Sequence, residues 1–168
     1  FKYPYSLGLL YSAITHRLGL KPNEDEYITM GMAAYGEPKY DLEYLLQKNN
    51  HWGVGNLLPN ARDEDLAASI QNLYESKLLE LLKYTTKNNL ILMGGCALNC
   101  VANSKIPDRY NIWIMPSPGD AGSSLGAAAL INKVRLNWKH PYLGHNIDRT
   151  INPKEVVRHL LEHKYCGI

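Results

Sequence analysis

Hydrophobic residues first recur at helical spacing near the amino end of the chain. Residues 6–18 place apolar side chains three or four positions apart, and Gly19 follows as a stop signal. This spacing predicts an amphipathic helix. A second helix is expected to begin at Asn23, whose side chain can cap its first turn, and to end at Met32 before a loop over 34–38.

The longest helical pattern follows a polar stretch that reaches residue 60. From Asp63 to about Lys83, leucine and isoleucine recur on one side of the predicted helix. Acidic residues occupy its first turn, where negative charge is favoured by the helix dipole. The sequence therefore predicts one long amphipathic helix over 63–83.

The pattern then changes to alternating short strands and helices. Residues 90–93 form an apolar run between Asn and Gly pairs, which predicts a buried strand, and a second strand is expected over 112–115. Helices are expected over 96–104 and 121–136. This alternation indicates an α/β fold with crossover helices, in which ligands usually bind beyond the carboxyl ends of the strands.

Composition excludes several classes of protein. The chain has 168 residues, a formal net charge of +2 and 45% hydrophobic residues, which is typical of a globular domain. It contains no run of 18 apolar residues, so we expect no membrane span. The 12 tyrosines are scattered and no basic stripe accompanies them, which makes nucleic-acid binding improbable. Three cysteines favour a reducing compartment, so we expect a cytoplasmic protein.

A boundary between two parts of the chain is expected near residue 140. Residues 132–168 hold 7 basic and 3 acidic residues, whereas acidic residues are in excess before them. The stretch 139–144 also interrupts any regular period.

Candidate chemistry lies at the ends of the two predicted strands. After the first strand, Gly94 and Gly95 let the backbone approach a ligand closely, and Asn99 can project an amide toward it. After the second, Asp120 opens a helix whose small residues leave amide N–H groups accessible to phosphate oxygens. A carboxylate beside a bound anion would suit a divalent metal. The alternative is that both loops are tight turns and that Asp120 only caps its helix.

Two further pairs of side chains have metal-binding spacing without a convincing context. His159 and His163 lie one helical turn apart, but the helix started by Asn152 and Pro153 favours a solvated face for them. Cys96 and Cys100 have the same spacing, and small core residues are favoured over a metal or redox pair.

Four segments resemble successive motifs of the nodulation-type (NodU) O-carbamoyltransferases. They are residues 5–13, 26–36, 94–103 (GGCALNCVAN) and 119–128 (GDAGSSLGAA). The resemblance implies the nucleotide-binding fold shared by actin, sugar kinases and heat-shock ATPases (the ASKHA fold, RNase H-like), in the version also used by tRNA threonylcarbamoyl synthases. Residues 1–140 would be its second lobe, and residues 141–168 a linker and the start of a carboxyl-terminal adenylate-forming domain.

The resemblance also implies a reaction and a set of site residues. The family transfers carbamoyl from a carbamoyl adenylate, made from carbamoyl phosphate and ATP, to a hydroxyl of a small natural product. Carried over by motif, Asp120 would bind iron or a similar divalent metal and Asn99 would contact the adenylate. The remaining cofactor-binding residues would be Gly8, Gly94, Gly95, Gly119, Gly122 and Ser123.

The resemblance implies partners that the chain needs for activity. An amino-terminal lobe with an HxxxH metal motif would precede Phe1, and the adenylate-forming domain would continue after Ile168. We therefore expect the chain to be inactive by itself, and the exposed face between lobes to make it self-associate into a homo-oligomer. The alternative is a degenerate lobe that serves as a nucleotide-binding or interaction module.

Overall fold

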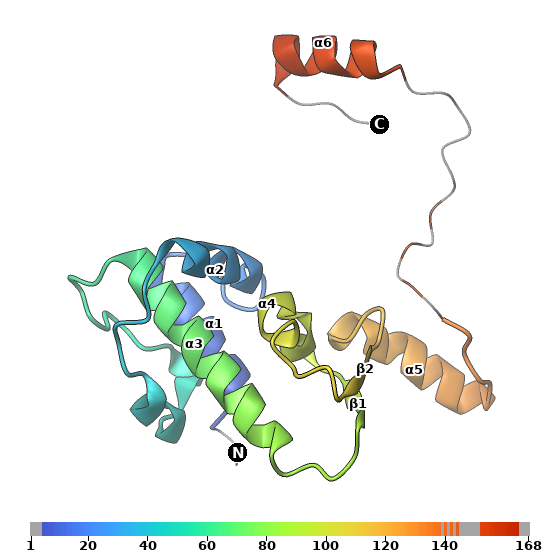
Figure 1. Cartoon of the computed structure of the whole chain (residues 1–168), viewed down its shortest axis with the longest axis horizontal. Helices are drawn as coiled ribbons and strands as arrows, with labels where there is room; N and C mark the ends of the chain where they lie inside the picture. The colour runs from blue at the N-terminus through green and yellow to red at the C-terminus, as the bar shows by residue number, and fades with distance from the viewer. Residues whose placement is uncertain (1–4, 139, 141, 143, 145–151, 165–168) are drawn as a thin grey trace. The chain divides into compact units, whose positions relative to one another are not determined.

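The computed structural model describes residues 5–138, 140, 142, 144 and 152–164. The chain divides into two units, residues 1–138 and 139–168. Figure 1 shows the elements, of which helix α6 (Pro153–His163) belongs to the second unit. The first unit contains helices α1 (Leu7–Arg17), α2 (Glu26–Met32), α3 (Asp63–Leu82), α4 (Cys100–Asn103) and α5 (Asp120–Asn132), strands β1 (Asn89–Leu92) and β2 (Asn111–Ile114), and short 3-10 helices η1 (Ala33–Tyr35), η2 (Glu43–Gln47), η3 (Asn50–Trp52) and η4 (Gly95–Leu98).

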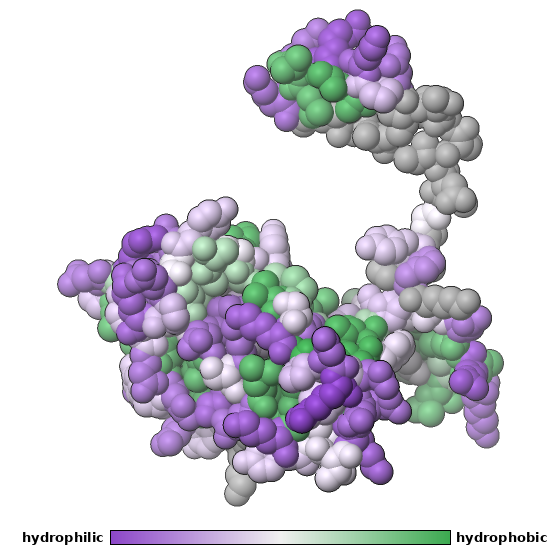
Figure 2. Space-filling view, in the orientation of Figure 1, coloured by the Kyte–Doolittle hydropathy of each residue, from purple (hydrophilic) through white to green (hydrophobic). Residues whose placement is uncertain are grey.

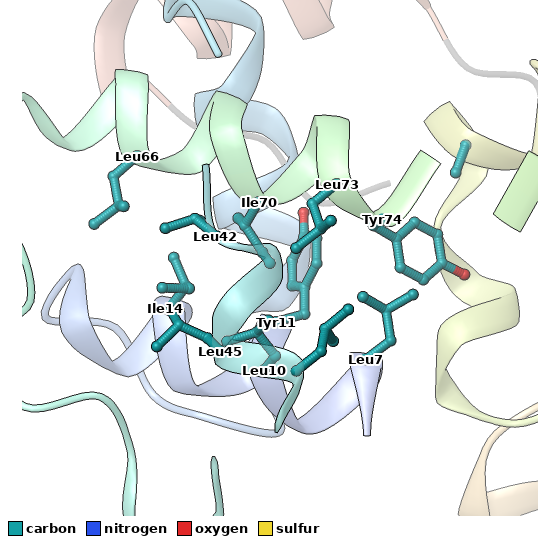
Figure 3. Close-up of a cluster of buried hydrophobic side chains, with 12 residues drawn as sticks. Leu7, Leu10, Tyr11, Ile14, Leu42, Leu45, Leu66, Ile70, Leu73 and Tyr74 are labelled. Carbon is teal, nitrogen blue, oxygen red and sulfur yellow. The ribbon is translucent and has the colours of Figure 1, made fainter. Parts of the chain in front are cut away.

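The main core lies where α1 packs on α3. Ser6 caps α1, because its Oγ accepts a hydrogen bond of 3.3 Å from the Leu9 amide, and Gly19 ends the helical stretch with a φ of +77°. The predicted helix over 6–18 is confirmed within one residue at each end. Figure 3 shows that its apolar side meets that of α3, with side chains from η2 between them. The buried residues of this cluster are Leu7, Leu10, Tyr11, Ile14, Leu42, Leu45, Leu46, Leu66, Ile70, Leu73, Tyr74 and Ala102.

Helix α2 begins later than its predicted capping residue. Asn23 adopts a left-handed φ of +62° in the loop, and Asp25 occupies the N-cap position of α2 without a side-chain capping bond. The expectation that Asn23 caps the helix was therefore wrong: its Oδ1 accepts a hydrogen bond of 3.5 Å from the Ser12 hydroxyl of α1, and its backbone amide donates to Glu26 Oε1 at 2.7 Å. The helix is joined to α1 by a buried hydrogen bond of 2.8 Å between Thr15 Oγ1 and Thr29 Oγ1.

The loop after α2 is held against the first turn of α3. Asp65 is buried there and accepts hydrogen bonds of 2.9 Å from the Glu37 amide and 2.8 Å from Lys39 Nζ. Gly36 crosses the α3 backbone so closely that an added Cβ would lie 1.9 Å from the Glu64 carbonyl oxygen. Only a residue without a side chain fits this crossing.

A parallel pair of strands confirms the predicted α/β alternation. β1 pairs with β2 in the register Leu90↔Ile112 and Leu92↔Ile114. Leu90 and Leu92 pack toward the end of α3 in a second apolar cluster with Leu82, Ile106 and Tyr110. The first strand was expected to be buried, but its alternate residues Ile91 and Met93 are exposed. The expectation was wrong because, among the described residues, only one face of β1 is covered.

Helix α5 is apolar and largely exposed. Its last turn carries Leu130 and Ile131, which are 79% and 80% exposed, and Trp113 of β2 is also exposed. Figure 2 shows apolar residues at the surface over α5. A helix that is apolar on most sides normally lies inside a protein, so this part of the unit presents a surface suited to further packing.

Two predicted helices are shorter than expected. The stretch 96–104 divides into η4 and α4, because the Asn99 side chain accepts a hydrogen bond of 2.9 Å from the Ala102 amide and starts a new helix. Helix α5 ends at Asn132 rather than residue 136, since Lys133 adopts a left-handed φ of +52°. The long helix over 63–83 is confirmed as α3 within one residue.

No helix among the described residues is long and apolar enough to cross a membrane.

Replacing Gly36 with Ala should destabilise the first unit. The new methyl group would overlap the Glu64 carbonyl, and displacing backbone in a packed region costs about 1–3 kcal/mol. The matched control is Gly31→Ala, since Gly31 lies in α2 with open space around it and should gain about 0.5–1 kcal/mol. Urea denaturation of both variants measures the difference; equal stabilities would contradict the close crossing.

Replacing Asp65 with Asn should lower the melting temperature at neutral pH. It should also make the melting temperature fall less steeply as the pH is lowered. The hydrogen bond from Lys39, and then that from the Glu37 amide, lower the pKa of Asp65 below its ordinary 3.8. A lowered folded-state pKa stabilises the fold above the ordinary pKa, and this contribution is lost as the pH falls from about 5 through the folded value.

The melting temperature measured as a function of pH separates the effect of the Asp65 hydrogen bonds from that of the helix dipole. The control is Asp63→Asn, which removes the same charge from the same helix turn. The Asp63 side chain is more exposed than that of Asp65, and its ion pair with Arg17 is longer, at 3.8 Å. The difference in melting temperature between wild type and Asp65→Asn should shrink in acid. A constant difference from pH 7 to about pH 2 would show that the Asp65 carboxylate contributes no such linkage.

Candidate functional site

The loops that follow the two strands lie against each other. The Gly94 amide donates a hydrogen bond of 2.7 Å to the Pro118 carbonyl, and Gly119 faces the Gly95 backbone. Gly94 has a φ of +85°, which only glycine adopts readily. Because β1 and β2 are parallel and adjacent (Figure 1), both of these loops leave the same edge of the sheet. The structure thus brings Gly94, Gly95 and Gly119 together.

Asp120 is the first residue of α5 and is exposed. Gly119, not Asp120, occupies the N-cap position, and no side chain caps this helix. The alternative that Asp120 is only an N-cap was therefore wrong. Asp120 therefore lies at the positive end of a 13-residue helix, directly after Gly119, which faces Gly95.

The remaining residues of this turn divide between packing and exposure. Gly122 is buried, and an added Cβ would lie 2.0 Å from the Ser117 carbonyl oxygen. Gly122 is therefore required for the close approach of α5 to its own preceding loop. Ser123 is exposed on the first turn of α5, one residue further along.

Asn99 is anchored to α3 as well as capping α4. Its Nδ2 donates to Gln71 Oε1 at 2.9 Å, and its Oδ1 accepts from Gln71 Nε2 at 3.1 Å. The side chain is half-buried, and one of its two Nδ2 hydrogens is used in this pair. Among the described residues, no hydrogen bond uses the other hydrogen.

A cavity of about 510 Å³ opens beside the first of these loops. Its volume lies in the range of small-molecule sites, and most of its lining is apolar. The lining residues are Tyr5, Ser6, Leu7, Gly8, Leu9, Tyr74, Leu78, Leu81, Leu92, Met93, Cys96, Ala97 and Asn103. The cavity therefore joins the start of α1, one side of α3 and the carboxyl end of β1.

Gly8 packs on Cys96 at one wall of this cavity. An added Cβ on Gly8 would lie 2.9 Å from Cys96 Sγ. Burial raises the pKa of the Cys96 thiol, while the hydrogen bond from Tyr74 acts in the opposite direction. At neutral pH the thiol is protonated, which does not suit a metal ligand or a nucleophile.

Among the described residues, neither candidate metal pair belongs to a group of three or more side chains that could hold a metal ion. Cys96 and Cys100 are free thiols and each residue is exposed as a whole, although the Cys96 sulfur itself faces Gly8. The expectation that both are core residues was therefore wrong, and Ala97 and Ala102 are the buried residues of this segment. His159 and His163 are exposed on α6, with ring centroids 4.4 Å apart.

The described residues do not supply a complete ligand set for the implied metal. In the part that the structure describes, no group of three or more His, Cys, Asp or Glu side chains could hold a metal ion. Any metal at Asp120 would need ligands from outside the described residues.

The sequence analysis missed three polar residues that fix this site. Gln71 and Glu75 are buried on α3, and Glu75 pairs with Lys105 just after α4. The signal that could have found them is the four-residue spacing of Gln71 and Glu75 within the apolar side of a helix.

Comparisons with known proteins agree on one family. A family model described as the carbamoyltransferase N-terminus matches residues 1–51 and 47–129. The chain is 38% identical to an uncharacterized protein of Synechocystis, over 84% of this chain and 28% of that protein. It is 30% identical to the nodulation protein NolNO of Sinorhizobium fredii, over 76% and 23% of the two chains. The nodulation protein NolO of Bradyrhizobium diazoefficiens is also 30% identical, over 76% and 28%. The chain spans about a quarter of the length of these relatives.

The contact between Gly8 and Cys96 predicts coupled stabilities. Gly8→Ala should destabilise the protein by about 1–3 kcal/mol, because the Cys96 thiol must move. Cys96→Ala removes the obstructing sulfur, so the double variant should recover most of that loss. Chemical denaturation of the four proteins gives the coupling energy. If the two effects on stability are strictly additive, the contact with Cys96 is not the reason that position 8 requires glycine.

Proposed function

Because the chain belongs to the carbamoyltransferase family through that family's N-terminal region, we propose that its parent protein is an ATP-dependent O-carbamoyltransferase. In this proposal carbamoyl passes from a carbamoyl adenylate to a hydroxyl of a small natural product. The observation that carries it is the contact between the two glycine-containing loops, Gly94 to Pro118, within the region that the family model matches. Residues 1–140 would be the second lobe of an ASKHA-type domain.

The adenylate would lie across the edge of the sheet where these loops meet. Its phosphate would approach the first amides of α5, at Gly119 to Ser123, where the helix dipole favours an anion. Its nucleoside would approach Gly94 and Gly95, whose small size permits close contact. The second Nδ2 hydrogen of Asn99 supports this placement. The neighbouring 510 Å³ cavity touches the first loop at Cys96 and Ala97, but Gly94, Gly95 and the start of α5 do not line it.

Further parts of the parent protein would complete the site. A metal held by Asp120 and by histidines of the preceding lobe would supply a positive charge at the phosphate, and the following domain would make the adenylate from ATP and carbamoyl phosphate. The exposed apolar surface of β1, β2 and α5 supports a covering lobe, since parallel strands are normally covered on both faces.

A non-catalytic nucleotide-binding or interaction module is the second candidate. It is favoured by the single carboxylate at the start of α5, which among the described residues has no companions suited to a metal. In that case nucleotide would bind without carbamoyl transfer.

Replacing Asp120 with Asn in the full-length protein tests the proposal. Asp120 is exposed and caps nothing, so stability should change by no more than about 1 kcal/mol, the size of a helix-dipole contribution. Metal content and carbamoyl transfer should fall by about ten- to a hundredfold or more, the scale of losing a metal-supporting group.

Asp108→Asn is the matched control, because Asp108 is also exposed and loses the same charge in the loop before β2. It should retain wild-type transfer of carbamoyl to the acceptor. Full activity and metal content in Asp120→Asn would refute the role of Asp120, whereas nucleotide binding without transfer by the wild-type protein would favour the second candidate.

A further inference from the structure

Two buried polar residues of α3 hold the segment that follows β1. Gln71 exchanges two hydrogen bonds with the Asn99 amide, and Glu75 forms an ion pair with Lys105. Gln71 and Glu75 are 5% and 7% exposed, so protein groups rather than bulk water satisfy them. The segment is thus fixed to α3 both before and after α4.

The donor and the acceptor of each hydrogen bond in this cluster can be assigned without ambiguity. The Ala102 amide must donate, so Asn99 Oδ1 is an acceptor and Gln71 Nε2 is the donor that faces it. The other Nε2 hydrogen goes to Glu75 Oε1 at 2.9 Å, and Gln71 Oε1 accepts from Asn99 and from the Tyr11 hydroxyl at 2.8 Å. All four hydrogen-bonding positions of the Gln71 amide are therefore occupied.

We propose that Gln71 and Glu75 are positioning residues for the loop over 94–99. Glu75 orients the Gln71 amide, Gln71 orients Asn99, and Asn99 sets where the 3-10 turn after Gly94 ends and α4 begins. The consequence for ligand binding rests on the proposed function, because that function places the nucleotide on this loop.

A role in packing alone does not account for this arrangement. Apolar side chains fill the neighbouring positions of α3, Ile70, Leu73 and Tyr74, and a buried amide and carboxylate stabilise a core less well than apolar groups of similar volume. Gln71 and Glu75 instead fix the orientation of the Asn99 side chain, because hydrogen bonds are directional and apolar contacts are not.

Hydrogen exchange in the full-length protein tests the positioning role without a ligand. In Gln71→Met and Glu75→Met, peptides that cover 95–104 should exchange about ten- to a hundredfold faster, because buried partners lose their hydrogen bonds. Peptides that cover α2, which makes no hydrogen bond to Gln71 or Glu75, should be unchanged. Glu75→Gln keeps an oxygen acceptor for Gln71 but weakens the ion pair with Lys105, so its exchange over 95–104 should lie between those of wild type and Glu75→Met.

Ser69→Ala is the matched control. Ser69 is a buried polar residue of the same helix, but it bonds to the Tyr40 amide and the Asp65 carbonyl, away from the loop. Its loss should leave exchange over 95–104 unchanged. If Gln71→Met and Ser69→Ala increase exchange to the same extent and in the same peptides, the positioning role is wrong.

ATP titration by calorimetry separates this inference from the proposed function. If the wild-type protein binds ATP, Gln71→Met should raise the Kd by about tenfold or more while Ser69→Ala leaves it unchanged. Unchanged affinity in Gln71→Met would overturn the effect on the ligand site. If the wild-type protein binds no ATP, the proposed function fails, and the exchange result alone still determines whether Gln71 and Glu75 position the loop.

Discussion

The contact between α1 and α3 is the constraint on which the rest of residues 5–138 depends. Leu10, Ile14, Leu66 and Ile70 are fully buried there, and burial of each such side chain contributes about 1.5–3 kcal/mol. The 3-10 helices, the loop after α2 and the short α4 contain too few residues to be stable alone. Of these, η2 joins this contact through Leu45 and Leu46, and α4 joins it through Ala102. Helix α3, at 20 residues, is long enough to support all of them and to cover one face of β1.

Polar residues on α3 fix the positions of the segments that pack against this helix. Asp65 binds the Glu37 amide and Lys39, and so fixes the loop after α2, whereas Gln71 and Glu75 fix the segment after β1. A buried polar group without a partner costs more than an apolar one, so each of these side chains favours the single arrangement that satisfies it. The same helix thereby determines the core and the placement of the candidate site.

One side of the strand pair has a different character. Ile91, Met93 and Trp113 are exposed on the sheet, and α5 exposes Leu130 and Ile131. Such surfaces are costly in water but ordinary inside a larger α/β domain, where both faces of parallel strands are covered. The chain spans about a quarter of the length of its relatives, and the exposed surface lies beside the loops that the family motifs identify.

The sequence by itself determined the order and type of most elements and the family. Spacing of apolar residues placed α1 and α3 within one residue at each end, because amphipathic periodicity is a local property. The motifs around Gly94 and Asp120 identified the carboxyl ends of the strands as the candidate site.

Tertiary structure decided what local patterns do not encode. Asn23 lies outside α2, with its side-chain oxygen on the Ser12 hydroxyl of α1, and Gly119 rather than Asp120 occupies the N-cap position of α5. It also decided that Asn99 pairs with Gln71, 28 residues away, because a hydrogen bond between distant segments exists only once the core has brought α3 and α4 together.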